Sequence, residues 1–167
     1  MASSACGDRR APTAEPPLLV AAGRLKSGPE ATLFAAWNAR LRPPLAVVEV
    51  PDSRGSPAEI RRREGAALLA AVPERAFAVA LDLGGTAPDS EGFARMVERW
   101  RGLGRRLAFL VGGAEGLDPA VLARADATLS LGPMTWPHLL VRALLAEQLF
   151  RAQAIASGHP YHRGWRP

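Results

Sequence analysis

The segment from His138 to Ala156 restricts the fold more than any other part of the chain. It contains no glycine or proline, and Pro137 precedes it. Because the missing N–H of proline has no partner in the first turn of a helix, we expect Pro137 to open a helix here, with Thr135 as its cap. Apolar side chains recur on more than one side of this helix, which predicts burial on more than one side. We expect a second subunit to cover the additional apolar face of this helix. We also expect Gly158 to end the helix in a left-handed backbone conformation.

Short apolar runs alternate with helical patterns along the rest of the chain. The predicted strands are 18–22, 45–50, 77–83, 107–111 and 127–131. The predicted helices before the last one are 29–40, 58–71, 90–103 and 119–124, the third capped by Ser90. Strands that are apolar along their whole length indicate a parallel sheet with helices on both faces. We therefore expect one α/β domain over 17–163, before a short extension (164–167). Residues 1–16 are expected to be a disordered tail, or the result of a start codon placed too far upstream.

Composition limits the class of protein. The chain has 167 residues, of which 48% are apolar and 22% charged, as in a soluble domain with a real core. No apolar run reaches the roughly 18 residues that cross a bilayer. Residues 1–16 hold no apolar core segment, so we do not expect them to be a secretory signal. The single cysteine, Cys6, forms no internal disulfide, which suits a reducing cytoplasm. The net charge of +5 favours a polyanion such as RNA, although an arginine-rich composition also explains it.

Three glycine-rich loops follow predicted strands: 83–85, 112–116 and 132–137. Ligands of open parallel sheets bind at the C-terminal ends of the strands, and glycine lets backbone groups approach a ligand closely. The first strand is not followed by a dinucleotide-binding GxGxxG, and GGAEG lacks the Lys-Ser/Thr ending of a phosphate loop. From the residues alone, tight turns, including one at Gly84-Gly85, are the favoured explanation of these glycines, with a ligand site as the alternative.

Three ordered motifs resemble one known family. They are AVALDLGG at 78–85, FLVGGAEGL at 109–117, and LSLGPMTWPHLLVRALLAEQLFRA with GHPYHR at 129–163. Over about 18–163 the chain resembles the bacterial ribosomal RNA large subunit methyltransferase H family, the pseudouridine N3 methyltransferases of the SPOUT class. The resemblance implies a SPOUT-type parallel sheet whose last strand and helix form a C-terminal trefoil knot. Pattern alone would not predict a knot, because knots are rare.

The resemblance also implies an activity. The cofactor would be S-adenosyl-L-methionine, and the substrate N3 of a pseudouridine in 23S ribosomal RNA on the assembled ribosome. The enzyme would be a cytoplasmic homodimer in which the tail of one subunit completes the pocket of the other. The implied cofactor-binding residues are Leu81, Gly113, Gly132, Pro133, Met134, Thr135, Trp136 and Pro137.

Methyl transfer to an imide nitrogen requires removal of its proton, which costs roughly 3 to 4 kcal/mol at about 1.36 kcal/mol per pKa unit. A neutral histidine can take the proton, and an arginine can hold the anionic ring. The candidate catalytic residues are Arg142, His159, Tyr161 and His162. We interpret His138 as structural and Asp82 as equally suited to the cofactor site or a turn. Two tail histidines without a third ligand do not indicate a metal.

Basic residues near the predicted strand ends are candidate phosphate contacts. They are Arg24, Lys26, Arg54 and Arg163, with Arg61 to Arg63 nearby. Two other readings remain open. One is a non-catalytic ribosome-binding or assembly factor on the same knotted fold, and the other is a nucleotide-binding hydrolase.

Overall fold

The computed structural model describes residues 15–161. Its strands are β1 (Leu18–Ala22), β2 (Ala46–Val50), β3 (Phe77–Thr86), β4 (Leu107–Val111) and β5 (Ala127–Leu129). Its helices are α1 (Pro29–Asn38), α2 (Pro57–Ala71), α3 (Ser90–Gly102), α4 (Pro119–Arg124) and α5 (His138–Ala156). The strands form one parallel sheet in the order β2-β1-β4-β3-β5. The predicted single α/β domain with a parallel sheet is confirmed.

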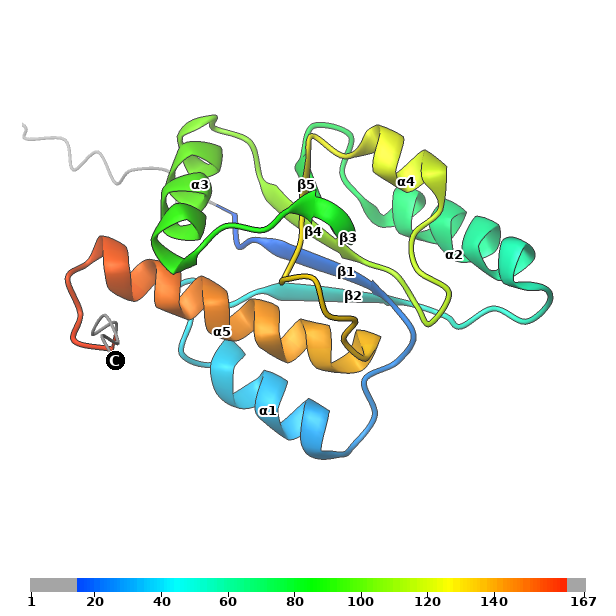
Figure 1. Ribbon diagram of the computed structural model, residues 1–167, viewed down its shortest axis with the longest axis horizontal. Coiled ribbons are helices and arrows are strands. Elements are labelled where there is room, and N and C mark those ends of the chain that lie inside the picture. Colours follow the sequence, from blue (N-terminus) through cyan, green and yellow to red (C-terminus); the bar gives the residue numbers. More distant parts are fainter. Residues whose placement is uncertain (1–14, 162–167) are drawn as a thin grey trace, which may run out of the picture.

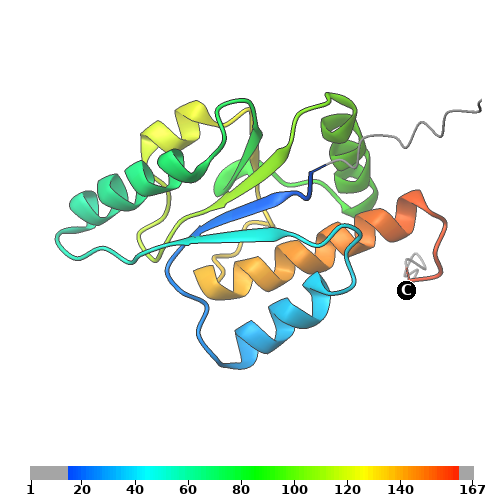
Figure 2. The same cartoon turned by 180° about the vertical axis from the view of Figure 1, so that it is seen from behind.

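Helices cover both faces of this sheet. Leu19 and Phe109 pack with residues of α1, α3 and α5, whereas Val20 and Leu110 pack with residues of α2 and α4. Figures 1 and 2 show α1 and α5 on one side of the sheet and α2 and α4 on the other. Because successive side chains of a strand point to opposite faces, a sheet covered on both faces needs strands that are apolar throughout. This explains the continuous apolar runs in the sequence.

Helix α5 is covered mainly by its own chain. It lies against both α1 and α3 and over the sheet, and Leu145, Ala146 and Leu149 are buried in that core. The second subunit expected from its apolar faces is therefore not needed for most of this burial. Leu140 and Leu144 remain only partly buried on α5. None of the helices in the described part of the chain is long and apolar enough to span a membrane.

Two of the predicted helix caps are wrong, and one helix end is confirmed. Pro137, not Thr135, occupies the position before the first residue of α5. Because proline has no side-chain donor or acceptor, the first turn of α5 has no side-chain cap, from Thr135 or from Pro137. At the start of α3 the cap is Asp89, whose side chain accepts from the N–H of Gly92, rather than Ser90. Gly158 ends α5 with a φ of 67°, as predicted.

The predicted turn at Gly84-Gly85 is also wrong, because β3 continues to Thr86. The pairing with β5 shifts register here, so that Leu81 and Thr86 both lie opposite Leu129. A Cβ atom on Gly85 would lie 2.7 Å from the backbone nitrogen of Leu129. A side chain at Gly85 would therefore collide with backbone that cannot move aside. Gly85 therefore allows the close approach of β3 to β5 and does not form a turn.

Candidate active site

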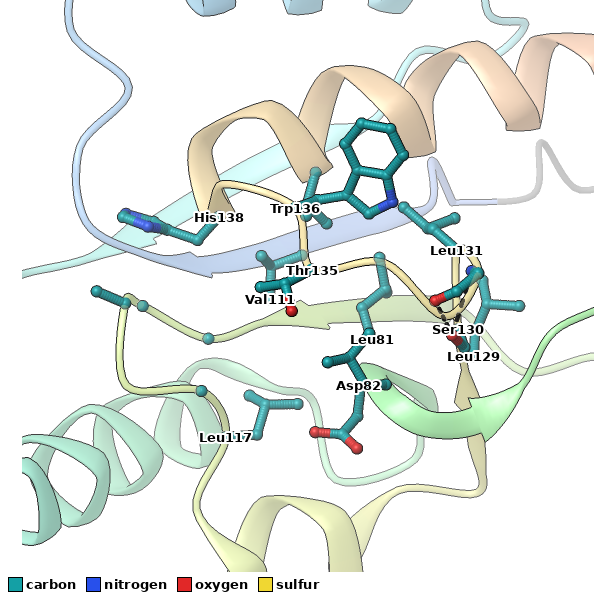
Figure 3. Close-up of a pocket in the computed structure, with 17 residues that line it drawn as sticks. Leu81, Asp82, Val111, Leu117, Leu129, Ser130, Leu131, Thr135, Trp136 and His138 are labelled. Atoms are coloured by element: carbon teal, nitrogen blue, oxygen red, sulfur yellow. Dashed lines mark hydrogen bonds between the residues drawn. The ribbon is translucent and has the colours of Figure 1, made fainter.

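A cavity of about 210 Å³ opens at the C-terminal edge of the sheet. Its walls come from the end of β3, the loop after β4, and the loop between β5 and α5 (Figure 3). The three glycine-rich segments that the sequence singled out therefore do come together, although the first of them lies in β3 and contributes only Leu83 to the lining. The lining residues are Leu81, Asp82, Leu83, Val111, Gly112, Gly113, Ala114, Gly116, Leu117, Leu129, Ser130, Leu131, Gly132, Thr135, Trp136, His138 and Val141.

Much of the cavity wall is aliphatic, with backbone groups at its edges. Leu81, Val111 and Leu129 contribute the aliphatic surface. The hydroxyl of Ser130 donates to the carbonyl oxygen of Gly132 (3.0 Å) and accepts from its N–H (3.2 Å), which closes a tight turn. Gly132 has a φ of 111°, which only glycine adopts readily. An apolar slot edged by backbone donors and acceptors suits a flat heterocyclic ring.

The loop after β4 is shaped by glycines in close contact. Gly113 and Gly116 form an isolated antiparallel bridge. A Cβ on Gly112 would lie 2.7 Å from the carbonyl carbon of Gly116, and one on Gly113 would lie 2.5 Å from Oε2 of Glu64. Glu64 is only 4% exposed, and its Oε1 accepts from the N–H of Ser53. A side chain at Gly112 would therefore collide with the backbone of Gly116, and one at Gly113 would collide with the buried Glu64.

A second cavity, of about 600 Å³, lies on the other side of the loop between β5 and α5. It is bordered by the start of α3 and by Leu144 and Gln148 of α5. Trp136 lines both cavities, and its indole Nε1 is buried without a hydrogen-bond partner among the described residues. Trp136 is therefore part of the wall between the two cavities, which also includes Leu129, Ser130, Leu131 and Gly132.

Comparison with known proteins decides the family. A family model described as "Predicted SPOUT methyltransferase" matches residues 18–162. The chain belongs to this SPOUT methyltransferase family. Two curated relatives share the name Ribosomal RNA large subunit methyltransferase H. The relative from Gluconacetobacter diazotrophicus is 68% identical over 89% of this chain and 98% of its own length. The relative from Acidiphilium cryptum is 57% identical over 89% of this chain and 94% of its own length.

Among solved structures, a probable methylase family protein from Haemophilus influenzae Rd KW20 superposes with a TM-score of 0.54 at 15% identity. The match covers 90% of this chain and 71% of that one. At this identity the likeness shows the fold alone. The family resemblance read from the sequence is confirmed by the family model and the curated relatives, and S-adenosylmethionine is the cofactor of this SPOUT methyltransferase.

The cavity of the methyltransferase contains most of the predicted cofactor residues. Leu81, Gly113, Gly132, Thr135 and Trp136 line it. Pro133 lines the second cavity instead, the Met134 side chain is 65% exposed, and Pro137 lines neither cavity. Apart from Leu81, the sequence missed the aliphatic lining residues at the strand ends, such as Val111 and Leu129, because in a buried strand they cannot be told from ordinary core positions.

Two titratable side chains line this cavity in the described part of the methyltransferase: Asp82 and His138. Oδ1 of Asp82 accepts a hydrogen bond from the N–H of Gly84 at 2.8 Å. A carboxylate here suits a cofactor that carries positive charge. The residues present therefore fit S-adenosylmethionine, with an apolar slot for its ring system and an acid for its cationic part. Among residues 15–161, no three metal-binding side chains cluster closely enough to hold an ion.

Arg142, a predicted catalytic residue, lies in the interior of the methyltransferase. Its side chain is 0% exposed, and its guanidinium donates to the carbonyl oxygens of Ala22 (2.6 Å) and Gly23 (2.7 Å) and to Oε1 of Glu49 (2.8 Å). Burial lowers the pKa of Arg142, and the Glu49 carboxylate opposes that shift. Arg142 does not line the cofactor cavity. In this position it anchors α5 to the ends of β1 and β2.

The predicted catalytic tail lies at the other end of α5. A helix of 19 residues is about 28 Å long at 1.5 Å per residue, so His159 and Tyr161 lie far from the cavity beside His138 of the same chain (Figure 1). The hydroxyl of Tyr161 donates to Glu147 at 2.8 Å. Burial, together with that bond, raises the pKa of Tyr161, so its phenol is neutral near pH 7. His162 and Arg163 lie outside the described residues.

Three of the predicted RNA contacts share the edge of the sheet with the cavity. Arg24 and Lys26 follow β1, and Arg54 follows β2, and all three are exposed. Because the strands are parallel, the loops after β1 and β2 leave the sheet at the same edge as the loops that form the cavity. The backbone carbonyl of Arg54 accepts from the guanidinium of Arg63 at 2.7 Å, which attaches this loop to α2. The arrangement places positive charge beside the cavity.

Proposed function

We propose that this protein transfers a methyl group from S-adenosylmethionine to N3 of a pseudouridine in 23S ribosomal RNA. The observation that carries the proposal is the open cavity formed by β3 and the glycine-rich loops 112–116 and 132–137, in a chain that is 68% identical to a Ribosomal RNA large subunit methyltransferase H. A protein that only bound ribosomes would have no need of this cavity. We place the reaction in the cytoplasm, on the assembled ribosome, because a domain this small gains recognition from a large preformed surface.

The substrate RNA is held by charge around the cavity. Arg24, Lys26 and Arg54 contact phosphates, since exposed cations supply most of the affinity for a nucleic acid backbone. The apolar slot beside Leu81 and the loop at Gly132 hold the ring system of the cofactor. The trefoil knot remains a prediction from the resemblance, supported by the close crossing of β3 and β5 at Gly85.

The functional unit is a homodimer in which each tail serves the cavity of the partner subunit. The separation of the tail from the cavity supports this arrangement, because within one chain the two lie at opposite ends of α5. Two α5 helices packed antiparallel bring each tail next to the other subunit's cavity. The partly buried Leu140 and Leu144 provide apolar surface for such contact.

The test of the activity is transfer of labelled methyl groups to ribosomes that lack the modification. Matched ribosomes with uridine in place of the target pseudouridine are the control. We expect label on the pseudouridine ribosomes alone. Label on both would refute the pseudouridine specificity. Absence of label with the cofactor still bound would refute the proposed acceptor, and absence of cofactor binding would favour the assembly-factor reading.

Mixing two defective variants tests the shared site. A chain ending at Ser157 keeps the cavity but lacks the tail, and Gly112→Ala damages the cavity but keeps the tail. At a cofactor concentration below the Kd of the wild type, we expect the truncated chain to be inactive and Gly112→Ala to keep at most about a tenth of wild-type turnover. Co-refolded dimers should recover about a quarter of wild-type turnover, because half of random dimers are mixed and each has one complete site. Full activity of the truncated chain, or inactivity of verified mixed dimers, would contradict the exchange of tails.

A further inference from the structure

Glu64 is the only acidic side chain among residues 15–161 that is buried. It lies on α2, only 4% of it is exposed, and its Oε2 has no hydrogen-bond partner among the described residues. Burying a polar atom without a partner costs free energy, so a carboxylate at this position needs a compensating contact. The contacts on the two sides of Glu64 identify what the carboxylate holds.

On one side, Glu64 holds the loop that follows β2. Its Oε1 accepts from the backbone N–H of Ser53 at 3.1 Å. The preceding residue of α2, Arg63, donates to the carbonyl oxygen of Arg54 at 2.7 Å. The side chain of Arg63 is 54% exposed, so the bond to Glu64 is the attachment that is shielded from water. This loop carries Arg54, one of the proposed phosphate contacts.

On the other side, Glu64 packs against the loop that follows β4. A Cβ atom on Gly113 would lie 2.5 Å from Oε2 and 3.3 Å from Cδ of Glu64, so the carboxylate rests against the bare backbone of this glycine. Gly113 lines the cofactor cavity and pairs with Gly116 across its loop. Figures 1 and 2 show the loops after β2 and β4 leaving the sheet at the same edge. One buried carboxylate therefore contacts both the loop of Arg54 and the wall of the cavity.

Helix α2 fixes the position of this carboxylate. A Cβ atom on Gly65 would lie 2.6 Å from Cβ of Asp118, the residue that caps α4. Helix α2 is therefore in close contact with the start of α4, and Leu68, one turn after Glu64, is 1% exposed. Side chains on packed helices are held more accurately than those on loops. Glu64 can therefore hold two loops without moving with either.

From these contacts we propose that Glu64 is a positioning residue of the methyl transfer, which holds the Arg54 loop and the Gly113 wall of the cavity in one arrangement. This role rests on the function proposed above. Glu64 does not line the cavity, so it acts through the two loops and moves no proton. It supplies an acceptor oxygen at a fixed reach from α2. Loss of that reach releases both loops, so the binding of the cofactor and the binding of ribosomes weaken together.

Three substitutions separate the reach of this side chain from its charge. Glu64→Ala removes the carboxylate, Glu64→Asp keeps the charge but shortens the side chain, and Glu64→Gln keeps the length and an acceptor oxygen. In the alanine and aspartate variants, the Kd for S-adenosylmethionine, measured by calorimetry, and the Kd for ribosomes, measured by sedimentation, should each rise about fivefold or more, the effect of one buried hydrogen bond.

Glu64→Gln should rescue both affinities to within about twofold of the wild type, because its amide oxygen can still accept from Ser53. With both substrates saturating, kcat should change by less than about threefold in all three variants, because the lost contact affects binding and not the transfer itself. Glu98→Ala, which removes an exposed acid of α3, is the control and should bind cofactor and ribosomes as the wild type does.

A double-mutant cycle tests the link to the Arg54 loop. Arg54→Ala alone should weaken ribosome binding, because it removes a phosphate contact. In the Glu64→Ala background the same change should have little further effect, because the loop no longer holds Arg54 in place. A variant that was merely less stable would show independent, additive effects. Urea unfolding checks that each variant is folded under the assay conditions, and Glu64→Asp takes the place of Glu64→Ala in the cycle if the alanine variant is not.

Several results would overturn this role. They are wild-type affinities in Glu64→Asp, a loss of only one of the two affinities, a Glu64→Gln variant as weak as Glu64→Asp, or an Arg54→Ala change that has no effect alone or is additive with the Glu64 variant. Absence of methyl transfer by the wild-type enzyme would refute the proposed function as well. Normal transfer by the wild type together with normal affinities in the Glu64 variants would refute only the role of Glu64.

Discussion

Replacing Arg142 with methionine should lower the free energy of unfolding by about 1 to 3 kcal/mol, the usual cost of leaving buried hydrogen-bonding groups without their partner. The guanidinium is fully buried, and its removal leaves Glu49 and the carbonyl oxygens of Ala22 and Gly23 without their partner. Urea unfolding followed by circular dichroism measures the change. Any loss of methyl transfer in Arg142→Met should then follow from this instability and from displacement of the loop after β1, not from a missing catalytic group.

The matched control is Arg95→Met. Arg95 forms a pair with Glu91 at 3.8 Å on the surface of α3, where both side chains are more than 60% exposed. Such pairs contribute about 0 to 1 kcal/mol, so the same substitution should change stability little. A loss below about 1 kcal/mol for Arg142→Met would contradict the anchoring role. If Arg142→Met were as stable as the wild type but transferred no methyl group, Arg142 would instead be a catalytic residue.

Replacing Gly112 with alanine should weaken binding of S-adenosylmethionine by at least about tenfold, or 1.4 kcal/mol. The added Cβ would lie 2.7 Å from the carbonyl carbon of Gly116, a backbone atom that cannot rotate away. The loop must therefore open, and its residues line the cofactor cavity. Overpacking of this kind also costs about 1 to 3 kcal/mol of stability. Calorimetric titration with the cofactor measures the first effect and urea unfolding the second.

Gly102→Ala is the control for this substitution. Gly102 ends α3, and a Cβ there would have no heavy atom within 4 Å among the described neighbours. Its cofactor affinity and stability should match those of the wild type. Unchanged affinity in Gly112→Ala would mean that the loop after β4 does not shape the cofactor site.

The layers of this fold could be predicted from the sequence because each element has a local signal. The apolar runs at 18–22 and 107–111 and the helices at 119–124 and 138–156 match the observed elements, since buried strands and uninterrupted helices are visible as patterns. The glycines of the three loops indicated where a cavity lies, because the ends of parallel strands share one edge. The identity of the cofactor came from the family resemblance and not from these patterns.

The remaining features depend on contacts between distant segments. The burial of Arg142 depends on Ala22, Gly23 and Glu49, all more than ninety residues away, and a basic residue in a helix gives no local sign of such partners. The continuation of β3 past Gly85 depends on its pairing with β5. The separation of His159 and Tyr161 from the cavity follows from the length and direction of α5, which only the packed structure provides.

The most direct test of the whole account is a crystal structure with S-adenosylmethionine bound. We expect the cofactor in the 210 Å³ cavity, in contact with Leu81, Gly113 and Gly132, with the carboxylate of Asp82 and the ring of His138 beside it. Density for the cofactor in the larger cavity bordered by α3, Leu144 and Gln148, or at another edge of the sheet, would contradict the assignment of the active site.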